Sequence, residues 1–379
     1  MKLRYKILSA IGILTLVTVS ALAVAISHDS PCGAAPPPPP GASVMKAVVY
    51  RCYGPPEVLK LEQIPQPPQA DKRMLVKVHA ASVNPLDWHY MRGEPYVMRA
   101  GAGMGTPDDI HMGVDFAGTV VSVGKDVTRF KPGDAVFGGK GGAFGEYVSV
   151  SESGSVAMKP DNMTFEQAAA VPIAAVTALQ ALRDKGKLRA GQRVLVNGAS
   201  GGVGTYAVQI AKAYGAEVTG VCSTKNLDLV KSIGADHVVD YTREDFTKSA
   251  QQYDLILDTV GTHSLSEYRR VLKPEGALVI VGSLDKGHWL GPLTGTINAI
   301  VYSRFVRQQM IFLLADLNPQ DLNTLRELIQ AGKIASVIDR RYALGDVPEA
   351  IRYLEQGHAR GKVVIAIDAE AARTAANIM

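Results

Sequence analysis

Residues 191–212 read GQRVLVNGASGGVGTYAVQIAK, and no other stretch restricts the fold of this chain as strongly. The apolar run 194–196 is typical of a buried strand, and apolar residues recur at helical spacing from 203 to 214. A glycine-rich turn separates the two. A strand, a glycine turn and a helix start bind a dinucleotide pyrophosphate, because the free N–H groups attract the phosphates and glycine lets them come close. We therefore expect a cofactor site at Ser200, Gly201, Gly202, Val203 and Gly204.

The same stretch carries a family resemblance. Its residues Gly191-Gln192, Leu195, Ala199-Ser200-Gly201-Gly202, Gly204, Gln209 and Lys212 resemble the signature of quinone oxidoreductases and zeta-crystallins, which are zinc-free medium-chain dehydrogenases/reductases. The resemblance extends over roughly residues 46–367. It implies an α/β protein with a GroES-like, β-rich catalytic domain and an inserted Rossmann domain, whose parallel sheet is doubly wound. It also implies a substrate pocket between the domains and a homodimer formed through the strand-like edge at 309–314.

The pattern along the chain predicts the same organisation. Short β-branched runs alternate with turns from 45 to about 150, which indicates a β-rich domain, and residues 161–185 are typical of helices. Strands and helices then alternate, which favours a parallel sheet. The expected strands are 193–197, 216–221, 236–240, 253–258 and 277–281, and the expected helices are 202–214, 226–233, 263–272 and, later, 319–331. We place the catalytic domain at 45–165, completed by 310–367, the Rossmann domain at 166–309, and a loose tail at 368–379.

The N-terminus is a separate segment. Lys2, Arg4 and Lys6 precede the uncharged, mostly apolar residues 7–26, which as a helix would span roughly 30 Å, about one hydrocarbon core. We expect residues 1–26 to form one hydrophobic helix that anchors the protein in a membrane. A cleaved signal peptide, giving a secreted or periplasmic protein, and a misassigned start remain alternatives. Residues 27–44 form a linker whose five prolines, 36–40, favour a stiff polyproline II spacer.

Charge and cysteine content exclude other classes of protein. The net charge of +4 is small and is not clustered, so the sequence does not indicate nucleic-acid binding. The three cysteines, Cys32, Cys52 and Cys222, lie far apart. We therefore expect neither a disulfide framework nor a metal cluster.

The end of the expected second strand indicates which cofactor is bound. An NAD enzyme usually carries an acid about 20 residues past the glycines, where it holds the ribose 2′-OH. Residues 221–226 contain no carboxylate, whereas Ser223, Thr224 and Lys225 offer donors and positive charge for a 2′-phosphate. We therefore predict NADP(H). The resemblance adds further cofactor contacts at Tyr241, Asp258, Val260, Gly282, Arg360 and Lys362.

The zinc ligands of the alcohol dehydrogenases in this superfamily have no counterparts. Zinc needs Cys, His or carboxylate ligands at an open tetrahedral site. The three positions where the resemblance would place them hold Asn84, Val114 and Ile173. We therefore expect a site without metal.

The segment 84–92 supplies the candidate catalytic residues. Without a Lewis acid, a hydrogen-bond donor must stabilise the negative charge that hydride transfer creates on the substrate. In related enzymes an Asn and a nearby Tyr face the nicotinamide, so Asn84 and Tyr90 are expected to donate to the substrate and Asp87 to orient its neighbours. Three roles fit the apolar residues 289–300: a roof over a hydrophobic substrate, a part of the protein core, or a patch that faces a membrane.

These residues favour an NADPH-dependent oxidoreductase that transfers hydride to a quinone or an α,β-unsaturated carbonyl, because such acceptors delocalise the negative charge. An alcohol or carbonyl oxidoreductase of the same zinc-free type and a non-catalytic NADPH-binding protein remain alternatives.

Overall fold

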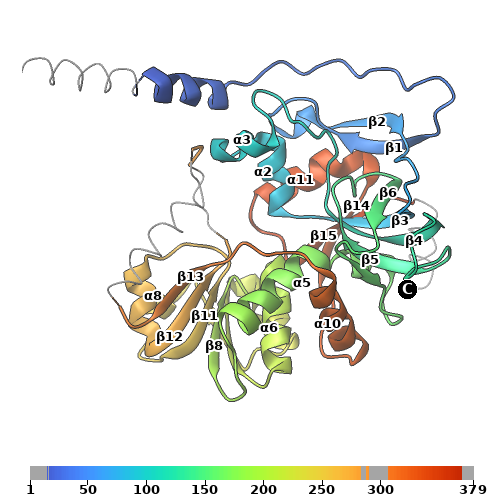
Figure 1. Ribbon diagram of the computed structural model, residues 1–379. Coiled ribbons are helices and arrows are strands. Elements are labelled where there is room, and N and C mark those ends of the chain that lie inside the picture. Colours follow the sequence, from blue (N-terminus) through green and yellow to red (C-terminus); the bar gives the residue numbers. More distant parts are fainter. Residues whose placement is uncertain (1–14, 16, 283–286, 290–305, 369–379) are drawn as a thin grey trace, which may run out of the picture.

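The computed structural model describes residues 15, 17–282, 287–289 and 306–368, which form two lobes. Figure 1 shows the parallel-sheet lobe below and the β-rich lobe above, with the N-terminal segment running along the outer edge of the β-rich lobe. Parts of three predicted segments lie outside the described residues. These are residues 7–14 and 16 of the hydrophobic run 7–26, the apolar segment 290–305, and the tail after 368.

The lower lobe contains a six-stranded, fully parallel sheet with the order β10-β9-β8-β11-β12-β13. Its strands are β8 (Arg193–Asn197), β9 (Glu217–Cys222), β10 (His237–Asp240), β11 (Tyr253–Asp258), β12 (Leu272–Ile280) and β13 (Gln309–Phe312). Helices α6 (Gly202–Ala213), α7 (Leu227–Ser232) and α8 (Leu265–Val271) connect them. The predicted parallel sheet is confirmed. The central strand β8 is apolar because both of its faces are covered, and Val194, Leu195 and Val196 are fully buried.

The upper lobe is built mainly on antiparallel pairing, and only β14 and β15 pair in parallel among its described strands. Its main sheet has the order β14-β15-β3-β4-β5-β7, with β6 paired to β3, and a separate hairpin joins β1 to β2. The strands are β1 (Val44–Val49), β2 (Lys60–Pro65), β3 (Arg73–Val83), β4 (Asp115–Val123), β5 (Ala135–Gly139), β6 (Tyr147–Ser151), β7 (Val156–Met158), β14 (Ile338–Ala343) and β15 (Lys362–Ala366). The last strand, β15, pairs with β3, so both ends of the chain build this lobe.

One boundary differs from the prediction. We placed residues 310–312 in the catalytic domain, but β13 pairs with β12 in the parallel sheet. The apolar run 310–313 buries Met310 and Leu313, so it completes the Rossmann core before the chain returns to the upper lobe.

The remaining helices join the two lobes or cover the upper one. They are α2 (Pro85–Arg92), α3 (Arg99–Ala102), α4 (Phe165–Ala169), α5 (Pro172–Leu179), α10 (Pro319–Gln330) and α11 (Val347–Glu355). Residues Gln180–Lys185 continue α5 as a π-helix, and 3-10 turns lie at Pro56–Val58, Tyr96–Met98, Thr224–Asn226, Phe246–Lys248 and Leu344–Asp346.

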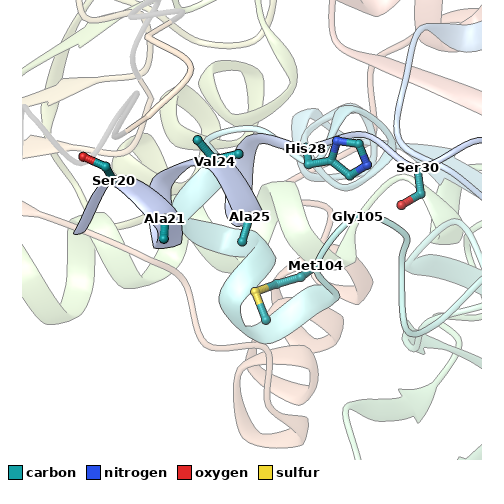
Figure 2. A pocket seen from close by; sticks show the side chains of 8 residues that line it. All are labelled: Ser20, Ala21, Val24, Ala25, His28, Ser30, Met104 and Gly105. Carbon is teal, nitrogen blue, oxygen red and sulfur yellow. The ribbon is translucent and has the colours of Figure 1, made fainter. Parts of the chain in front are cut away.

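The N-terminal segment is helical over the described residues up to 27. Among the described residues, no helix has both the length and the apolar content that crossing a bilayer requires. Val17, Val19, Leu22 and Val24 are more than half exposed, and the helix lies beside an open hollow (Figure 2). The hollow is lined by Ser20, Ala21, Val24, Ala25, His28, Ser30, Met104 and Gly105.

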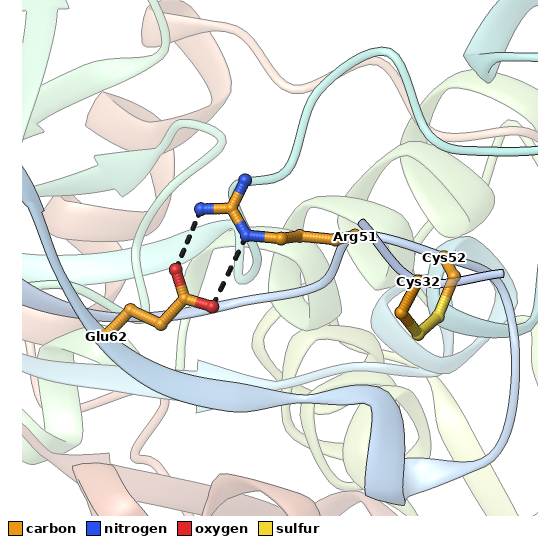
Figure 3. The surroundings of a disulfide bond; sticks show 4 residues. All are labelled: Cys32, Arg51, Cys52 and Glu62. Atoms are coloured by element: carbon orange, nitrogen blue, oxygen red, sulfur yellow. Dashed lines mark hydrogen bonds and ion pairs between the residues drawn. A yellow bond between two sulfur atoms is a disulfide. The ribbon is translucent and has the colours of Figure 1, made fainter. Parts of the chain in front are cut away.

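Residues 26–32, which we call the N-terminal strap, are fixed to the upper lobe. A disulfide joins Cys32 to Cys52 close to the Arg51–Glu62 ion pair (Figure 3). The fully buried Arg99 pairs with Asp29 at 2.8 Å and donates to the carbonyls of residues 26 and 28 at 3.2 and 3.3 Å. Our expectation that the cysteines form no disulfide was therefore wrong. The proline-rich loop leads back along the lobe, and this brings two cysteines 20 residues apart into contact.

Candidate active site

The glycine turn lies at the carboxyl end of β8, next to the point where the strand order reverses. Gly198 has a φ of +82°, and a Cβ on Gly204 would lie 2.1 Å from the Gly198 carbonyl oxygen. Both positions therefore require glycine. Gly201 caps α6 without a side-chain hydrogen bond, so the N–H groups of the first helical turn face outward without a protein cap. This arrangement fits a pyrophosphate.

A hydrogen-bonded group joins the glycine turn to the end of β9. The Asn226 amide nitrogen donates to the hydroxyl oxygens of Ser200 and Ser223, at 3.0 and 3.2 Å. Lys225 is exposed beside them. The backbone N–H of Tyr241 donates to the Cys222 carbonyl, so the exposed Tyr241 side chain begins at the same edge of the sheet. The structure thus gathers the residues predicted for the 2′-phosphate.

Sequence reasoning missed one acid at this edge. Asp240 ends β10 directly opposite Cys222, and its carboxylate accepts from the Thr224 hydroxyl at 2.5 Å and from the Thr242 hydroxyl at 2.7 Å. The Thr224 hydrogen bond is the main cause that lowers the pKa of Asp240. The hydroxyl of Thr224 is therefore directed at Asp240. The parallel pairing of β9 with β10 sets Asp240 opposite Cys222, two residues before Thr224, so this pairing was the signal that could have revealed the contact.

The turns after β11 and β12 lie beside the glycine turn. Asp258 is buried and accepts from the Asn197 amide at 3.0 Å and from the backbone N–H groups of Val260 and Gly261, at 3.1 and 3.0 Å. Its carboxylate thus shapes the turn. A Cβ on Gly282 would lie 2.4 Å from the Thr259 carbonyl oxygen, which packs the two loops together.

The last strand brings the upper lobe to the glycine turn. The backbone N–H of Gly361 donates to the Ser200 carbonyl at 2.8 Å, and Gly361 forms a parallel bridge with Gly201. Arg360 is exposed, and its N–H donates to Asp339 at 2.9 Å. Lys362, by contrast, is buried, and its side chain leads away from solvent.

Lys362, Asn84 and Asp115 form a buried polar group, which we call the Asn84 cluster. The Lys362 ammonium donates to Asn84 Oδ1 at 2.5 Å and lies 3.5 Å from Asp115 Oδ2. Asn84 Nδ2 donates to Asp115 at 2.9 Å and to the Ser82 carbonyl at 3.3 Å. Asp115 also accepts from the Ser82 hydroxyl and from the Ile173 N–H, both at 3.0 Å. Burial raises the pKa of Asp115, but these donors and the ammonium favour its ionised form.

Helix α2 carries the other candidate residues. Asp87 is buried and accepts from the Asn84 N–H at 2.7 Å, which caps the helix. Burial raises the pKa of Asp87 to about 7, with a smaller contribution from the charge of Asp115. Tyr90 points outward with 38 % of its surface exposed. The helix therefore separates a buried acid from an accessible phenol.

The positions that carry zinc ligands in related dehydrogenases meet around Asp115. Asn84 and Ile173 both donate to its carboxylate, and Val114 precedes it. In the part of the chain that the structure describes, no group of three or more His, Cys, Asp or Glu side chains is placed to hold a metal ion. Asp115 was not among the site residues predicted from the sequence. Its contact with Lys362 spans 247 positions and was not visible in any local pattern.

A parallel nucleotide-binding sheet joined to a GroES-like lobe defines a nicotinamide-dependent oxidoreductase, and comparisons with known proteins agree. Residues 70–161 match the family described as alcohol dehydrogenase GroES-like domain, and residues 233–365 match the family described as zinc-binding dehydrogenase. The mitochondrial NAD(P)H oxidoreductase RTN4IP1 of Mus musculus is 37 % identical over 360 residues, covering 86 % of this chain and 89 % of its own length.

Two further relatives fix the family. The 2-methylene-furan-3-one reductase of Solanum lycopersicum is 36 % identical, over 85 % of this chain and 79 % of its own length. The solved structure of the quinone oxidoreductase from Coxiella burnetii is 31 % identical with a TM-score of 0.75, over 86 % of this chain and 100 % of that structure. The chain belongs to the medium-chain dehydrogenase/reductase family, among its quinone and NAD(P)H oxidoreductases, as the resemblance predicted.

Proposed function

We propose that this enzyme uses NADPH to reduce a quinone or an α,β-unsaturated carbonyl compound without a metal ion. The observation that carries the proposal is the direct junction of the glycine turn with the Asn84 cluster through Gly361 and Lys362. Relatives named as a quinone oxidoreductase and as an NADPH-dependent alkenal/one oxidoreductase support the substrate class. The bound cofactor would supply the hydride, and the chain supplies position and hydrogen-bond donors.

The proposed donors to the substrate oxygen are Asn84 and Tyr90. One Asn84 hydrogen is held by Asp115, whereas the other has only the long 3.3 Å contact with the Ser82 carbonyl and is the one a substrate can take. Tyr90 offers an accessible hydroxyl on the same helix. Asp87 holds the Asn84 backbone from the buried side. Conjugated acceptors suit such a site, because delocalisation in the acceptor already stabilises much of the charge that hydride transfer creates, so that two neutral donors can stabilise the rest without a metal ion.

The substrate class is tested with the chain starting at Met45. We expect NADPH oxidation, followed by its absorbance, with a short-chain quinone and with an alkenone, and little with a saturated ketone of the same size. Turnover of simple alcohols or ketones alone would contradict the proposed class. NADPH binding without turnover of any acceptor would instead indicate a non-catalytic role.

The choice of NADP(H) over NAD(H) is also a proposal. It is supported by Ser223, Lys225 and Tyr241 at one edge of the sheet and by the lack of a carboxylate between 222 and 226. The carboxylate of Asp240 does not strongly disfavour a 2′-phosphate, because the hydroxyls of Thr224 and Thr242 donate to its two oxygens.

The Lys225→Ala variant tests this choice. Loss of a charged donor to the 2′-phosphate is expected to raise the Kd for NADPH by at least about tenfold, since a hydrogen bond between charged groups contributes about 1.5–3 kcal/mol. The Kd for NADH should change less than about threefold. Cofactor fluorescence titration measures both constants, and Lys231→Ala, an exposed lysine on α7, is the matched control. Equal weakening of both cofactors would overturn the assignment.

Membrane association and dimerisation remain proposals. Exposed valines and a leucine lie on opposite sides of the N-terminal helix, and Lys2, Arg4 and Lys6 precede it, which suits a membrane with anionic headgroups. Flotation of the full chain with anionic vesicles, compared with the chain starting at Met45, tests the membrane association.

Strand β13 is an edge strand and Leu314 beside it is 83 % exposed, which supports a dimer through this edge. Sedimentation of the Leu314→Lys variant against the wild type tests the dimer.

A further inference from the structure

Lys362 lies where the glycine turn, the start of β15 and the end of β3 meet. Its neighbour Gly361 is hydrogen-bonded to the glycine turn. Its aliphatic stem lies under that turn, because a Cβ on Gly202 would be 3.3 Å from Lys362 Cδ. Its ammonium reaches the end of β3, where it meets Asn84 Oδ1 and the Val83 carbonyl at 2.5 and 3.3 Å. The resemblance alone suggested that this lysine binds the cofactor, but its charged end is buried away from the helix start.

The two charged groups of the Asn84 cluster fix the orientation of the Asn84 amide. A lysine ammonium can only donate, and an ionised carboxylate can only accept. Lys362 therefore requires Oδ1 on its side, and Asp115 requires Nδ2 on the other. A flipped amide would place Nδ2 against the ammonium and Oδ1 against the carboxylate. Both contacts would be repulsive, and the hydrogen offered to a substrate would be replaced by an acceptor.

We propose that Lys362 is a positioning residue, which locks the Asn84 amide in its donating orientation and links that orientation to the phosphate-binding turn. The inference rests on the proposed function, in which Asn84 contacts the substrate. It assigns the ammonium to the amide and not to a cofactor phosphate. Cofactor binding at the turn can thus influence the Asn84 amide, since Gly361, which contacts the turn, is adjacent to Lys362, which contacts Asn84.

The first test separates positioning from cofactor binding. The Lys362→Met variant keeps the length of the side chain and removes the charge. We expect kcat to fall at least about 100-fold, the lower end of the range seen when a donor to an oxyanion is lost, while the Kd for NADPH and the KM for the acceptor change less than about threefold. Lys333→Met, the same substitution at an exposed lysine after α10, should leave all three unchanged. A tenfold rise in the Kd for NADPH with kcat retained would show that Lys362 is a phosphate ligand and overturn the proposal.

Two double variants test whether Lys362 acts through Asn84. Lys362→Met combined with Asn84→Ala should be no slower than Asn84→Ala alone, whereas multiplied losses would mean an independent role. Lys362→Met leaves the Asp115 charge buried without its partner, and this can prevent folding. Lys362→Met combined with Asp115→Asn removes both charges, so it should fold and still show the low kcat. Wild-type kcat in this variant would refute the proposal.

A last readout needs no turnover and so separates this inference from the proposed function. With ¹⁵N-labelled asparagine, the Asn84 Nδ2 hydrogens are identified by NMR from their loss in Asn84→Ala. Lys362→Met should speed their exchange with solvent at least about tenfold, because the amide then loses the one donor that holds Oδ1 and is oriented from the Nδ2 side alone, and Lys333→Met should not. Unchanged exchange would overturn the positioning role even if the wild type reduced no quinone or enone. If the wild type reduced neither acceptor but Lys362→Met still exchanged faster than the wild type, the positioning role would stand and only the proposed reaction would be rejected.

Discussion

Replacing Gly204 by alanine is expected to weaken NADPH binding at least about 100-fold. The new Cβ would lie 2.1 Å from the Gly198 carbonyl oxygen and 2.8 Å from Ala199 Cα, and both are backbone atoms that cannot rotate away. The first turn of α6 must therefore move, and its N–H groups lose their alignment with a pyrophosphate. We expect the Kd for NADPH to rise at least about 100-fold, because two misaligned hydrogen bonds to a charged group cost about 3 kcal/mol or more. Fluorescence titration measures the change.

The matched control lies in the same turn. A Cβ on Gly201 would meet the Gly198 oxygen at 3.4 Å, and the φ of Gly201, −82°, suits alanine. Gly201→Ala should therefore keep its melting temperature and lose less than about tenfold in affinity, whereas Gly204→Ala should also melt at lower temperature. Similar affinities in the two variants would show that the turn tolerates a Cβ at residue 204 and that the packing argument fails.

Replacing Asp87 by asparagine is expected to change how stability depends on pH. Burial raises the pKa of the Asp87 carboxyl from its usual 3.8 to about 7. The folded protein thus holds this proton more tightly than the unfolded chain does. Asp87 contributes its full stabilisation below about pH 4, and this contribution is lost as the pH rises towards 7. The interval corresponds to about 4 kcal/mol, since one pKa unit is about 1.4 kcal/mol.

Asparagine does not titrate in this range and keeps an oxygen that can accept from the Asn84 N–H. The stability of Asp87→Asn relative to the wild type should therefore increase by up to about 4 kcal/mol between pH 4 and pH 8. Thermal melting of both proteins across this range measures the difference, and the exposed Asp71→Asn serves as control. Parallel curves for wild type and variant would mean that Asp87 is ionised in the folded protein throughout.

Local patterns sufficed for most of the fold. The five strands expected between 193 and 281 all form, although β12 begins at Leu272, earlier than its apolar run indicated. The glycine turn was recognisable because strand, turn and helix signals occupy 22 consecutive residues. Residues 84–92 were treated as a pocket segment, yet they form helix α2, begun by Pro85 and capped by Asn84 and Asp87. A proline at the helix start together with the Asn–Asp spacing was the available signal.

Long-range contacts explain what was missed. The pairing of Lys362 with Asn84 depends on β15 lying against β3, which no local pattern encodes. The disulfide between Cys32 and Cys52 was judged from spacing alone, and spacing does not show that Arg99 holds the N-terminal strap, which ends at Cys32, in place. The acid at residue 240 escaped notice because its neighbour Thr224 lies in the 3-10 turn that follows another strand, β9. In each case the partner is fixed by the tertiary fold.

The position of β15 in the chain has a consequence for biosynthesis. The strand follows all six strands of the parallel sheet in the sequence, and its start supplies Lys362, whose neighbour Gly361 contacts the glycine turn. Because a chain is made from its N-terminus, the strands β8 to β13 exist before Gly361 and Lys362 do. The glycine turn can therefore form before its contact with the upper lobe, and a chain that stops before residue 362 would lack the ammonium that contacts Asn84.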